Sequence, residues 1–385
     1  MLFFVSCPLE FENELAKELK SFWFEMIDLD GLPTRAEFPQ LEIIRGGIQF
    51  ETAEHLGYQI NFFSKIASRV LLRISKFEAR YFDQFEKGFT QVDLTKYLLT
   101  NDLKLKVEAH KSRINNEKNI IEAANNVLTK KKYKHNTESL NTVYIRIEKD
   151  RVTISLDTSG EHLHKRGYAE HRGEAPLRET LAAYLIKKLQ QHIAIDENLS
   201  LIDPFVGSGT ILFEANSCNL PNFERTYAFF NFKNAPKLFK SESWKKNYRW
   251  FKNSGVPQSL GFDFDEKAIQ ALENNKIKFN KIFKLIFNSS DLDLTVKVQD
   301  SRDLKLERSM LRQAVWVVTN PPYGIRLADE NAKQVLEKIE EIADGIIVIH
   351  PALWKFNFRT LSLAETEDFK NQGLNLKLSV FVKKN

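Results

Sequence analysis

Cysteine is scarce in this sequence. Its 385 residues include only Cys7 and Cys218, which lie far apart along the chain. Two isolated cysteines exclude a disulfide framework and a zinc site of the CxxC type. Each cysteine is therefore predicted to be a small buried apolar side chain.

Long apolar runs and a basic leader are also missing. No stretch reaches the roughly 18 apolar residues that a membrane helix needs. The first residues soon meet acids at Glu10, Glu12 and Glu14. The sequence thus predicts neither a transmembrane helix nor a secretory signal, and the expected location is the cytoplasm.

A large excess of one charge is absent too. The chain has 56 Lys and Arg against 51 Asp and Glu, which gives a formal charge of +5. Hydrophobic residues make up 43% of the chain, which argues against a disordered protein. At this length, two or three globular domains are expected.

The pattern of apolar residues in the first part of the chain predicts two small α+β units. Short apolar or β-branched runs alternate with segments whose apolar residues have helical spacing. The first unit is expected to have strands at 3–5, 41–50 and 68–75 and helices at 9–24 and 52–63. The second is expected to have a strand at 103–110, a helix at 117–130 and a hairpin at 142–159 that turns at Lys149-Asp150.

From residue 176 onward, strands and helices alternate regularly, which is typical of a doubly wound parallel sheet. Strands are predicted at 199–203, 259–262, 295–299, 314–319 and 345–349, and helices at 177–191, 209–218, 265–280 and 332–343. The closing residues 374–382 alternate apolar and polar side chains, as a strand paired antiparallel near a sheet edge would. The predicted fold class is α/β, preceded by α+β units.

The stretch LIDPFVGSGT at 201–210 joins the first of these strands to its helix, where ligands bind in such folds. It lacks both the GxGxxG of dinucleotide folds and the GK of a phosphate-binding P-loop. Gly207 and Gly209 would let the backbone approach a ligand closely. Asp203 would repel a pyrophosphate but could accept hydrogen bonds from an amino-bearing ligand. The alternative is a tight turn without a ligand.

Two further acids end the next strands of the predicted sheet. Asp263 is positioned to accept both hydroxyls of a ribose, and Asp300 follows the strand after it. Acids at three successive strand ends suit a nucleoside that carries a positive group and lacks phosphates. S-adenosylmethionine fits that description. Each acid alone could instead be an ordinary capping residue.

The fourth strand runs directly into the sequence NPPYG at 320–324. Pro321 and Pro322 fix the backbone, so that the Asn320 side-chain carbonyl and the Pro321 carbonyl can converge on one amino group. Such acceptors favour the nucleophilic form of an exocyclic amine, and Tyr323 could stack on its base. The alternative is a rigid turn.

Basic residues are concentrated in three places. Residues 101–135 carry nine Lys or Arg against four acids, and residues 233–252 carry seven against one, interleaved with aromatic side chains. This pattern suits RNA, although a solvated helix end and buried aromatics are alternatives. A third cluster includes His162 and His164, but it lacks acids or cysteines at ligand spacing, so no metal site is predicted.

The sequence resembles class I S-adenosylmethionine-dependent amino-methyltransferases in DPFVGSGT, the strand-end acids and NPPYG. The segment LDTSGEHLHKRGYAEHRGEAPLRETLAAYL at 156–185 is similar to the segment that joins the THUMP domain to the catalytic domain in the RlmL-like group of 23S rRNA guanine-N2 methyltransferases. The resemblance implies an N-terminal ferredoxin-like region at 1–60, a THUMP RNA-binding domain at 61–157, a linker at 158–175 and a methyltransferase domain at 176–385.

The resemblance also implies roles for individual residues. The expected catalytic residues are Asn320, Pro321, Pro322 and Tyr323. The expected S-adenosylmethionine-binding residues are Pro176, Leu177, Thr180, Asp203, Phe205, Gly207, Ser208, Gly209, Thr210, Asp263, Phe264 and Asp300. The basic clusters, independently of the resemblance, give the expected RNA-binding residues Lys111, Arg113, Lys130, Lys131, Lys132, Lys165, Arg166 and Arg172.

The sequence therefore predicts an enzyme that transfers a methyl group from S-adenosylmethionine to N2 of a guanine in structured RNA, with 23S rRNA as the expected partner. A THUMP-type tRNA guanine-N2 methyltransferase is the close alternative. A non-catalytic RNA-binding protein that retains a vestigial cofactor fold is a third hypothesis.

Overall fold

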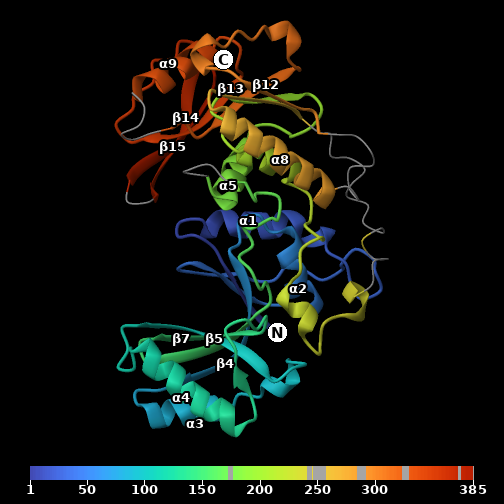
Figure 1. Cartoon of the computed structure of the whole chain (residues 1–385), viewed down its shortest axis with the longest axis vertical. Helices are drawn as coiled ribbons and strands as arrows, with labels where there is room; N and C mark the ends of the chain where they lie inside the picture. The colour runs from blue at the N-terminus through green and yellow to red at the C-terminus, as the bar shows by residue number, and fades with distance from the viewer. Residues whose placement is uncertain are drawn as a thin grey trace. The chain divides into compact units, whose positions relative to one another are not determined.

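The computed structural model describes residues 1–171, 177–240, 245, 257–283, 292–322, 329–371 and 374–384. The chain divides into two compact units (Figure 1). Unit 1 comprises Met1–His164 together with Phe223–Tyr248, and unit 2 comprises Lys165–Asn222 together with Arg249–Asn385. Each unit is built on one sheet in the described part of the chain.

Unit 1 contains an eight-stranded sheet in the order β2-β3-β1-β4-β8-β7-β5-β6. The long strand β4 pairs with β1 along one edge and with β8 along the other, so both halves of the sheet are continuous. The expected units 1–60 and 61–157 thus share one sheet. The strands are β1 (Leu2–Ser6), β2 (Glu42–Ile44), β3 (Gly47–Glu51), β4 (Arg69–Glu78), β5 (Asp102–His110), β6 (Lys134–His135), β7 (Thr142–Glu148) and β8 (Arg151–Asp157).

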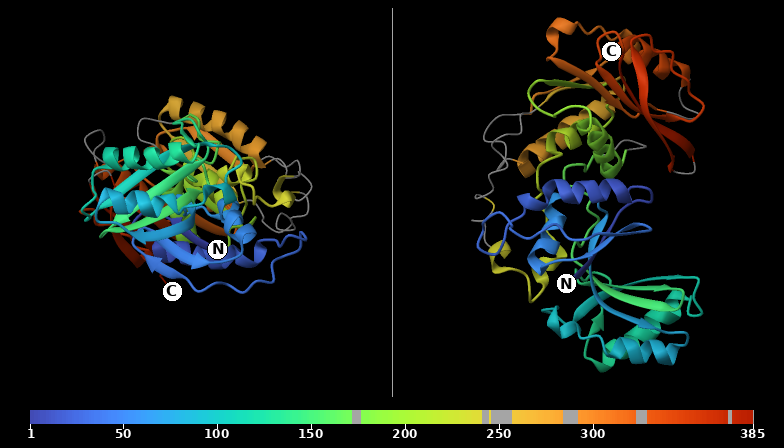
Figure 2. Two further views of the ribbon diagram at one scale, coloured as in Figure 1. Left: turned by 90° about the horizontal axis from the view of Figure 1, so that it is seen from below. Right: turned by 180° about the vertical axis from the view of Figure 1, so that it is seen from behind.

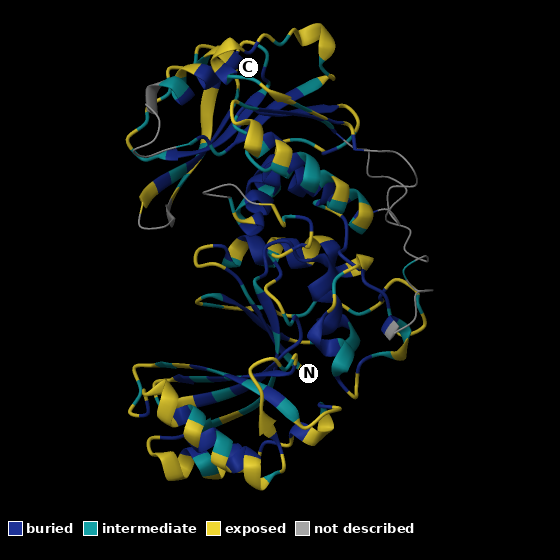
Figure 3. Ribbon diagram, viewed as in Figure 1, coloured by how far each residue is buried: buried dark blue, intermediate teal, exposed yellow. Residues whose placement is uncertain are grey.

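The helices of unit 1 follow from amphipathic segments. They are α1 (Glu12–Phe22), α2 (Glu54–Phe63), α3 (Phe82–Thr90) and α4 (Glu117–Lys130). At the start of α4 the Asn116 side chain accepts a 3.2 Å hydrogen bond from the Asn119 amide, which caps the helix. α3 and α4 lie together on one side of β4, β5 and β7 (Figures 1 and 2). Figure 3 shows the buried stripe and the exposed stripe of α4.

Residues 223–240, which we call the returning segment, belong to unit 1 although they follow residues 165–222, which belong to unit 2. The ring of Phe229 stacks on that of Tyr58 with centroids 4.8 Å apart, and Phe223 packs edge-on against Phe62. Phe232 forms a β-bridge with Leu98. The unit boundaries therefore differ from the expected linker at 158–175 and the expected uninterrupted domain at 176–385.

Unit 2 contains a seven-stranded sheet in the order β11-β10-β9-β12-β13-β15-β14. The first five of these strands are parallel, and β15 is antiparallel to both of its neighbours. The strands are β9 (Leu199–Asp203), β10 (Gln258–Asp263), β11 (Leu294–Val298), β12 (Ala314–Thr319), β13 (Gly345–Pro351), β14 (Leu361–Asn371) and β15 (Leu374–Lys383).

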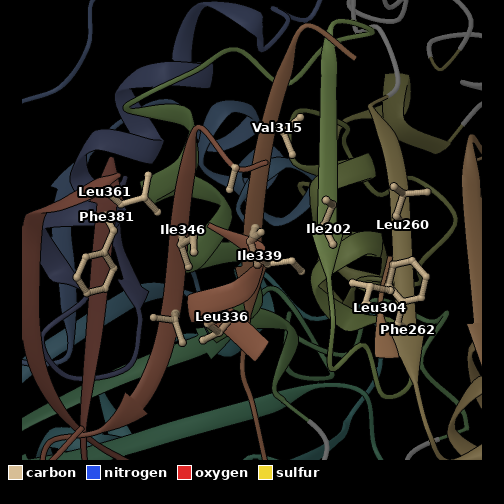
Figure 4. Close-up of a cluster of buried hydrophobic side chains, with 13 residues drawn as sticks. Ile202, Leu260, Phe262, Leu304, Val315, Leu336, Ile339, Ile346, Leu361 and Phe381 are labelled. Atoms are coloured by element: carbon tan, nitrogen blue, oxygen red, sulfur yellow. The ribbon is translucent and has the colours of Figure 1, made fainter. Parts of the chain in front are cut away.

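The described helices of unit 2 are α5 (Glu179–Gln190), α6 (Thr210–Ser217), α8 (Glu266–Phe283) and α9 (Asp329–Ile339). Leu336 and Ile339 of α9 pack with Val317 and Ile346 in a buried cluster on one face of the sheet (Figure 4). Alternate residues of the parallel strands supply this cluster, as a doubly wound sheet requires. Among the described residues, no helix combines the length and apolar character needed to cross a membrane.

Candidate active site

The sequence motifs of unit 2 meet at the carboxyl edge of its parallel strands. Asp203 ends β9, Asp263 ends β10, Asp300 follows β11 and Asn320 follows β12. These strands are neighbours in the order β11-β10-β9-β12. The chain winds outward from β9 in one direction through β10 and β11 and in the other through β12 and β13. Asp203 and Asn320 thus flank the point where the winding reverses, which is where ligands bind in open α/β sheets.

Asp203 is almost fully buried, with 1% of its surface exposed. Its carboxylate accepts hydrogen bonds from the Thr319 hydroxyl at 2.6 Å and from the Phe205 amide at 3.1 Å. No basic side chain among the described residues forms an ion pair with it. Burial raises the pKa of Asp203 to about 7, against the opposing effect of these two hydrogen bonds. A cationic ligand group at this carboxylate would compensate for its burial.

The two glycines of the turn have different surroundings. Gly207 has a φ of +51°, and a Cβ atom placed on it would meet no atom within 4 Å. Gly209 has a φ of +87°, but a Cβ atom there would lie 2.8 Å from Leu272 Cγ and 2.8 Å from Phe213 Cε2. Gly207 therefore leaves open space beside the turn, whereas Gly209 allows the turn to pack against side chains of the protein.

Asp263 is held in place by the same turn. One carboxylate oxygen accepts a 3.0 Å hydrogen bond from the Gly207 amide, and the other accepts a 3.0 Å hydrogen bond from the Asp265 amide. Burial raises the pKa of Asp263 above its usual value, although these backbone hydrogen bonds oppose that effect. Each oxygen keeps a further lone pair for a ligand hydroxyl. The neighbouring Phe264 ring is 60% exposed and available for stacking.

Asp300 differs from the other two acids because it has a cationic partner. Arg302 Nη2 lies 2.6 Å from its carboxylate, and the Arg302 amide donates a 2.9 Å hydrogen bond to it. These hydrogen bonds from Arg302 lower the pKa of Asp300. Asp300 thus caps a short 3-10 turn at Ser301–Asp303, and an adenine amino group would have to share the carboxylate with Arg302.

Asn320 presents a buried acceptor. Its side-chain oxygen is shielded from solvent and has no hydrogen-bond partner among the residues that the structure describes. Pro321 beside it is buried, and Pro322 is half-buried. A buried carbonyl oxygen without a donor is unfavourable, so a substrate N–H group would fit here. Tyr323 lies outside the described residues.

The remaining expected cofactor residues lie near the starts of two helices. Thr180 is buried in the first turn of α5, with Leu177 half-buried just before it, and Pro176 lies outside the described residues. Thr210 begins α6, directly after Ser208 and Gly209. The sequence did not single out Thr319, whose position as the last residue of β12, directly before Asn320, was the available signal.

The basic residues expected to bind RNA differ in exposure. Lys111, Arg113, Lys130, Lys132 and Lys165 are exposed, whereas Lys131 is half-buried and donates a 2.8 Å hydrogen bond to the Val92 carbonyl. Arg172 lies outside the described residues, as do most of residues 241–256.

The RNA-binding role expected for Arg166 is wrong. Its side chain is 3% exposed, and Arg166 Nε lies 3.2 Å from the buried Glu214 carboxylate, which also accepts a hydrogen bond from the Tyr168 hydroxyl. A buried acid in the apolar helix α6 needs such a cation. Arg166 therefore belongs to the interior of unit 2.

In the ranges that the structure describes, no group of three or more His, Cys, Asp and Glu side chains has the arrangement of a metal site. The ring of His162 stacks on that of His164, with centroids 5.3 Å apart.

Known proteins resemble this chain in sequence. Residues 166–341 match the family model described as "RMKL-like, methyltransferase domain". The chain is 28% identical over 375 residues to the "Ribosomal RNA large subunit methyltransferase K/L" of Marinomonas sp. (strain MWYL1), with 92% of this chain and 48% of that protein covered. The protein of the same name from Pseudomonas putida (strain GB-1) is 28% identical over 345 residues, with 85% of this chain and 44% of that protein covered. The chain spans about half the length of the curated relatives it matches.

Solved structures resemble it over its whole length. A possible methylase from Clostridium difficile 630 superposes with a TM-score of 0.77 at 23% identity, covering 100% of this chain and 98% of the other. A putative methyltransferase complexed with SAH gives 0.75 at 19% identity, with the same coverage. TrmN from Thermus thermophilus gives 0.66 at 14% identity, with both chains covered completely. The fold is thus that of class I methyltransferases, as the sequence predicted.

Proposed function

We propose that the chain methylates large-subunit ribosomal RNA with S-adenosylmethionine as cofactor, on the premise that residues 166–341, which match the RMKL-like methyltransferase model, form its catalytic domain. Two observations support the substrate class: the names of the curated relatives and the length of the match, which includes unit 1. The expected RlmL-like resemblance is confirmed.

The residues at the carboxyl edge of the unit 2 sheet fit the cofactor. Asp203 is a buried carboxylate without a basic partner in the described residues, which suits the amino group of the methionine part. Asp263 has lone pairs free for two ribose hydroxyls, and the Phe264 ring beside it can cover the adenine. The space beside Gly207 admits a ligand close to the backbone. When bound, S-adenosylmethionine supplies the electrophilic methyl group.

The proposal depends most on the buried oxygen of Asn320, for which the described part of the chain offers no hydrogen-bond donor. The exocyclic amine of guanine is a poor nucleophile because its lone pair is delocalised into the ring. Acceptors at Asn320 Oδ1 and at the Pro321 carbonyl hold both N–H bonds and favour the pyramidal nitrogen. As positive charge develops on this nitrogen, both hydrogen bonds strengthen, so the acceptors act mainly on the transition state.

The finer specificity that we propose is N2 of guanine. A base that is stacked in a helix cannot reach the edge of the sheet, so the target guanine has to be unpaired or flipped out of its helix. Unit 1 is proposed to contain the THUMP domain that positions the RNA.

Incubation with S-adenosylmethionine carrying a tritiated methyl group tests this proposal. Deproteinised large-subunit rRNA and total tRNA serve as parallel substrates, and the labelled RNA is digested to nucleosides for identification. We expect the label as N2-methylguanosine from rRNA. A label on adenine would contradict the base assignment, and a label in tRNA alone would contradict the substrate. An Asn320→Ala variant is the control for contaminating activity.

A further inference from the structure

One face of the unit 1 sheet carries a row of side chains across four strands. Lys106 of β5 is paired with Tyr144 of β7, Tyr144 is paired with Ser155 of β8, and Ser155 is paired with Arg73 of β4. Directly paired residues point to the same face of a sheet. Their neighbours along the strands, such as Val143 and Leu156, are fully buried on the opposite face.

The row is organised around the Tyr144 ring. Lys106 Nζ donates a 3.2 Å hydrogen bond to the Tyr144 hydroxyl and lies 5.4 Å from the centre of its ring. The Arg69 guanidinium lies 5.8 Å from the same centre, but it is already paired with the buried Asp157. Among the described residues, no ion pair neutralises Lys106 at this end.

The other end of the row is also cationic. Arg73 lies over the Phe4 ring, 4.5 Å from its centre, and donates a hydrogen bond to the Gln49 side chain. Lys76 donates to the same Gln49 oxygen at 3.3 Å. Since Gln49 is neutral, this oxygen positions two cations without neutralising either of them.

Four cations on this face have no carboxylate within ion-pair distance among the described residues, namely Arg73, Lys76, Lys104 and Lys106. Acids are present on this face too: Glu108 lies two residues after Lys106 on β5 and is paired with Arg146, which itself contacts Glu148 at 2.9 Å. Glu42 accepts a hydrogen bond from the Gln49 side-chain amide. Burial and the nearby Arg146 lower the pKa of Arg73 to about 10. The face thus holds like charges close together, an arrangement that an anionic partner would relieve.

We propose that this basic face, formed by Arg73, Lys76, Lys104, Lys106 and Tyr144, binds the phosphate backbone of the substrate RNA. The inference rests on the proposed function, because that function supplies an RNA partner. Three strand spacings separate β4 from β5, or about 14 Å, which is long enough for several successive backbone phosphates. Cations around an aromatic ring suit RNA better than an acidic protein surface, since the ring adds a stacking surface.

This surface is distinct from the lysine run at the end of α4. Helices α3 and α4 cover the opposite face of the same strands, where Leu105, Ile145 and Leu156 are buried (Figure 1). The proposal therefore assigns the main backbone contacts to sheet residues, which were not among the RNA-binding residues expected from the sequence.

The test compares RNA binding by two full-length variants with equal loss of charge. The first is Arg73→Gln/Lys106→Gln, and the control is Lys20→Gln/Lys87→Gln, which changes exposed lysines on α1 and α3. Filter binding to deproteinised large-subunit rRNA is measured from 50 to 200 mM salt, without methyl transfer. We expect the first variant to bind at least about 10-fold more weakly, with a slope of log K against log salt smaller by about 1.4–1.8.

Equal affinity and equal slope in the two variants would overturn the inference. Affinity for S-adenosylmethionine checks that each variant is folded, and Arg73→Lys/Lys106→Arg, which keeps both charges, should bind RNA within a few-fold of the wild type. RNA binding is measured without catalysis. A wild type that binds RNA but does not methylate it would therefore contradict the proposed function, while the difference in RNA affinity between the two variants would still test the basic face. Normal methylation together with unchanged RNA affinity in the first variant would contradict only the basic face.

Discussion

The Thr319 hydroxyl lies 2.6 Å from the Asp203 carboxylate, and this hydrogen bond joins the ends of the neighbouring strands β12 and β9. Asp203 is proposed to hold the cofactor, and Asn320, the residue after Thr319, is proposed to hold the substrate amine. The hydrogen bond therefore links the proposed cofactor site to the proposed substrate site. It also favours the ionised form of the Asp203 carboxylate, which burial disfavours.

Folding stability should depend on the protonation of Asp203. Its pKa is raised from 3.8 to about 7 in the folded protein, so the unfolded chain releases this proton first as the pH rises. The contribution of Asp203 to stability should therefore fall between pH 4 and pH 7 and stay constant above that range. Denaturant unfolding of the wild type and of Asp203→Asn at a series of pH values measures it. A stability difference that does not change with pH would contradict the raised pKa.

Loss of the Thr319 hydroxyl should raise the pKa of Asp203 further, because one hydrogen bond to the ionised form disappears. In Thr319→Val the pH window of the Asp203 effect should therefore extend above pH 7. Denaturant unfolding of Thr319→Val and of Thr319→Val/Asp203→Asn at a series of pH values tests whether the pKa of Asp203 rises. If the pH range over which the stability difference changes is unchanged or lower, the Thr319 hydroxyl does not stabilise the ionised Asp203 carboxylate.

Alanine at the two turn glycines should have different effects. Both positions have positive φ, which costs roughly 1–2 kcal/mol for an L-residue. Gly209→Ala should lose a further 1–3 kcal/mol or so, because the new Cβ atom would overlap Leu272 and Phe213. Gly207→Ala should instead mainly weaken S-adenosylmethionine binding. Thermal unfolding and calorimetric titration separate the two outcomes, and equal stability loss with equal affinity would contradict this division.

Asp263→Ala should weaken S-adenosylmethionine binding by about 1.5–3 kcal/mol for each ribose hydrogen bond lost. Asp265→Ala is the matched control. The Asp265 carboxylate accepts a 2.9 Å hydrogen bond from the Lys267 amide at the start of α8, so this variant should lose helix stability and keep its affinity. Calorimetry on the folded variants measures both. Wild-type affinity in Asp263→Ala would exclude the ribose role.

Asn320→Ala should lower the methylation rate by about 10²–10³ with little change in cofactor affinity, because the lost acceptor acts on the transition state. Asn320→Asp keeps an acceptor and should retain more activity. Single-turnover assays with rRNA distinguish these outcomes from a binding defect. A wild-type rate in Asn320→Ala would mean that NPPY is a structural turn.

Deletion of residues 1–157 should abolish rRNA methylation, because the proposed RNA surfaces are lost. It should also expose Phe229 and Phe232 of the returning segment, which are fully buried in the intact chain. The truncated protein is therefore expected to aggregate, whereas the same truncation with Phe229→Ser/Phe232→Ser should stay dispersed and bind S-adenosylmethionine. Light scattering and calorimetry measure this. A dispersed truncation with both phenylalanines intact would contradict the role of the returning segment.

Local signals in the sequence located much of the fold. Helix 117–130 has the predicted bounds because its cap at Asn116 and its apolar spacing are local features. The turn at Lys149-Asp150 was also predicted, and both residues have the positive φ of a tight hairpin. The strand ends Asp203, Asp263 and Asn320 were located because parallel strands place their carboxyl ends at one edge.

Elements that depend on distant partners were not predicted. Strand β14 is rich in polar residues, and two of its acids, Glu365 and Glu367, are held by Lys188 of α5, far away in the sequence. The short helix α3 contains Gly88, whose position has no room for a side chain beside Phe77. Arg166 was misread for the same reason, since its partner Glu214 is 48 residues away.

The returning segment imposes an order on biosynthesis. When the ribosome has translated residue 164, the strands of unit 1 have all been made, but the segment that covers Tyr58 and Phe62 has not. The elements made next are α5, β9 and α6 of unit 2, before Phe239 completes the cover. At synthesis rates of about 5–20 residues per second, residues 165–239 take roughly 4–15 s. During this interval the apolar surface at Tyr58 and Phe62 is still uncovered, so unit 1 can finish folding only after the first part of unit 2 has been synthesised.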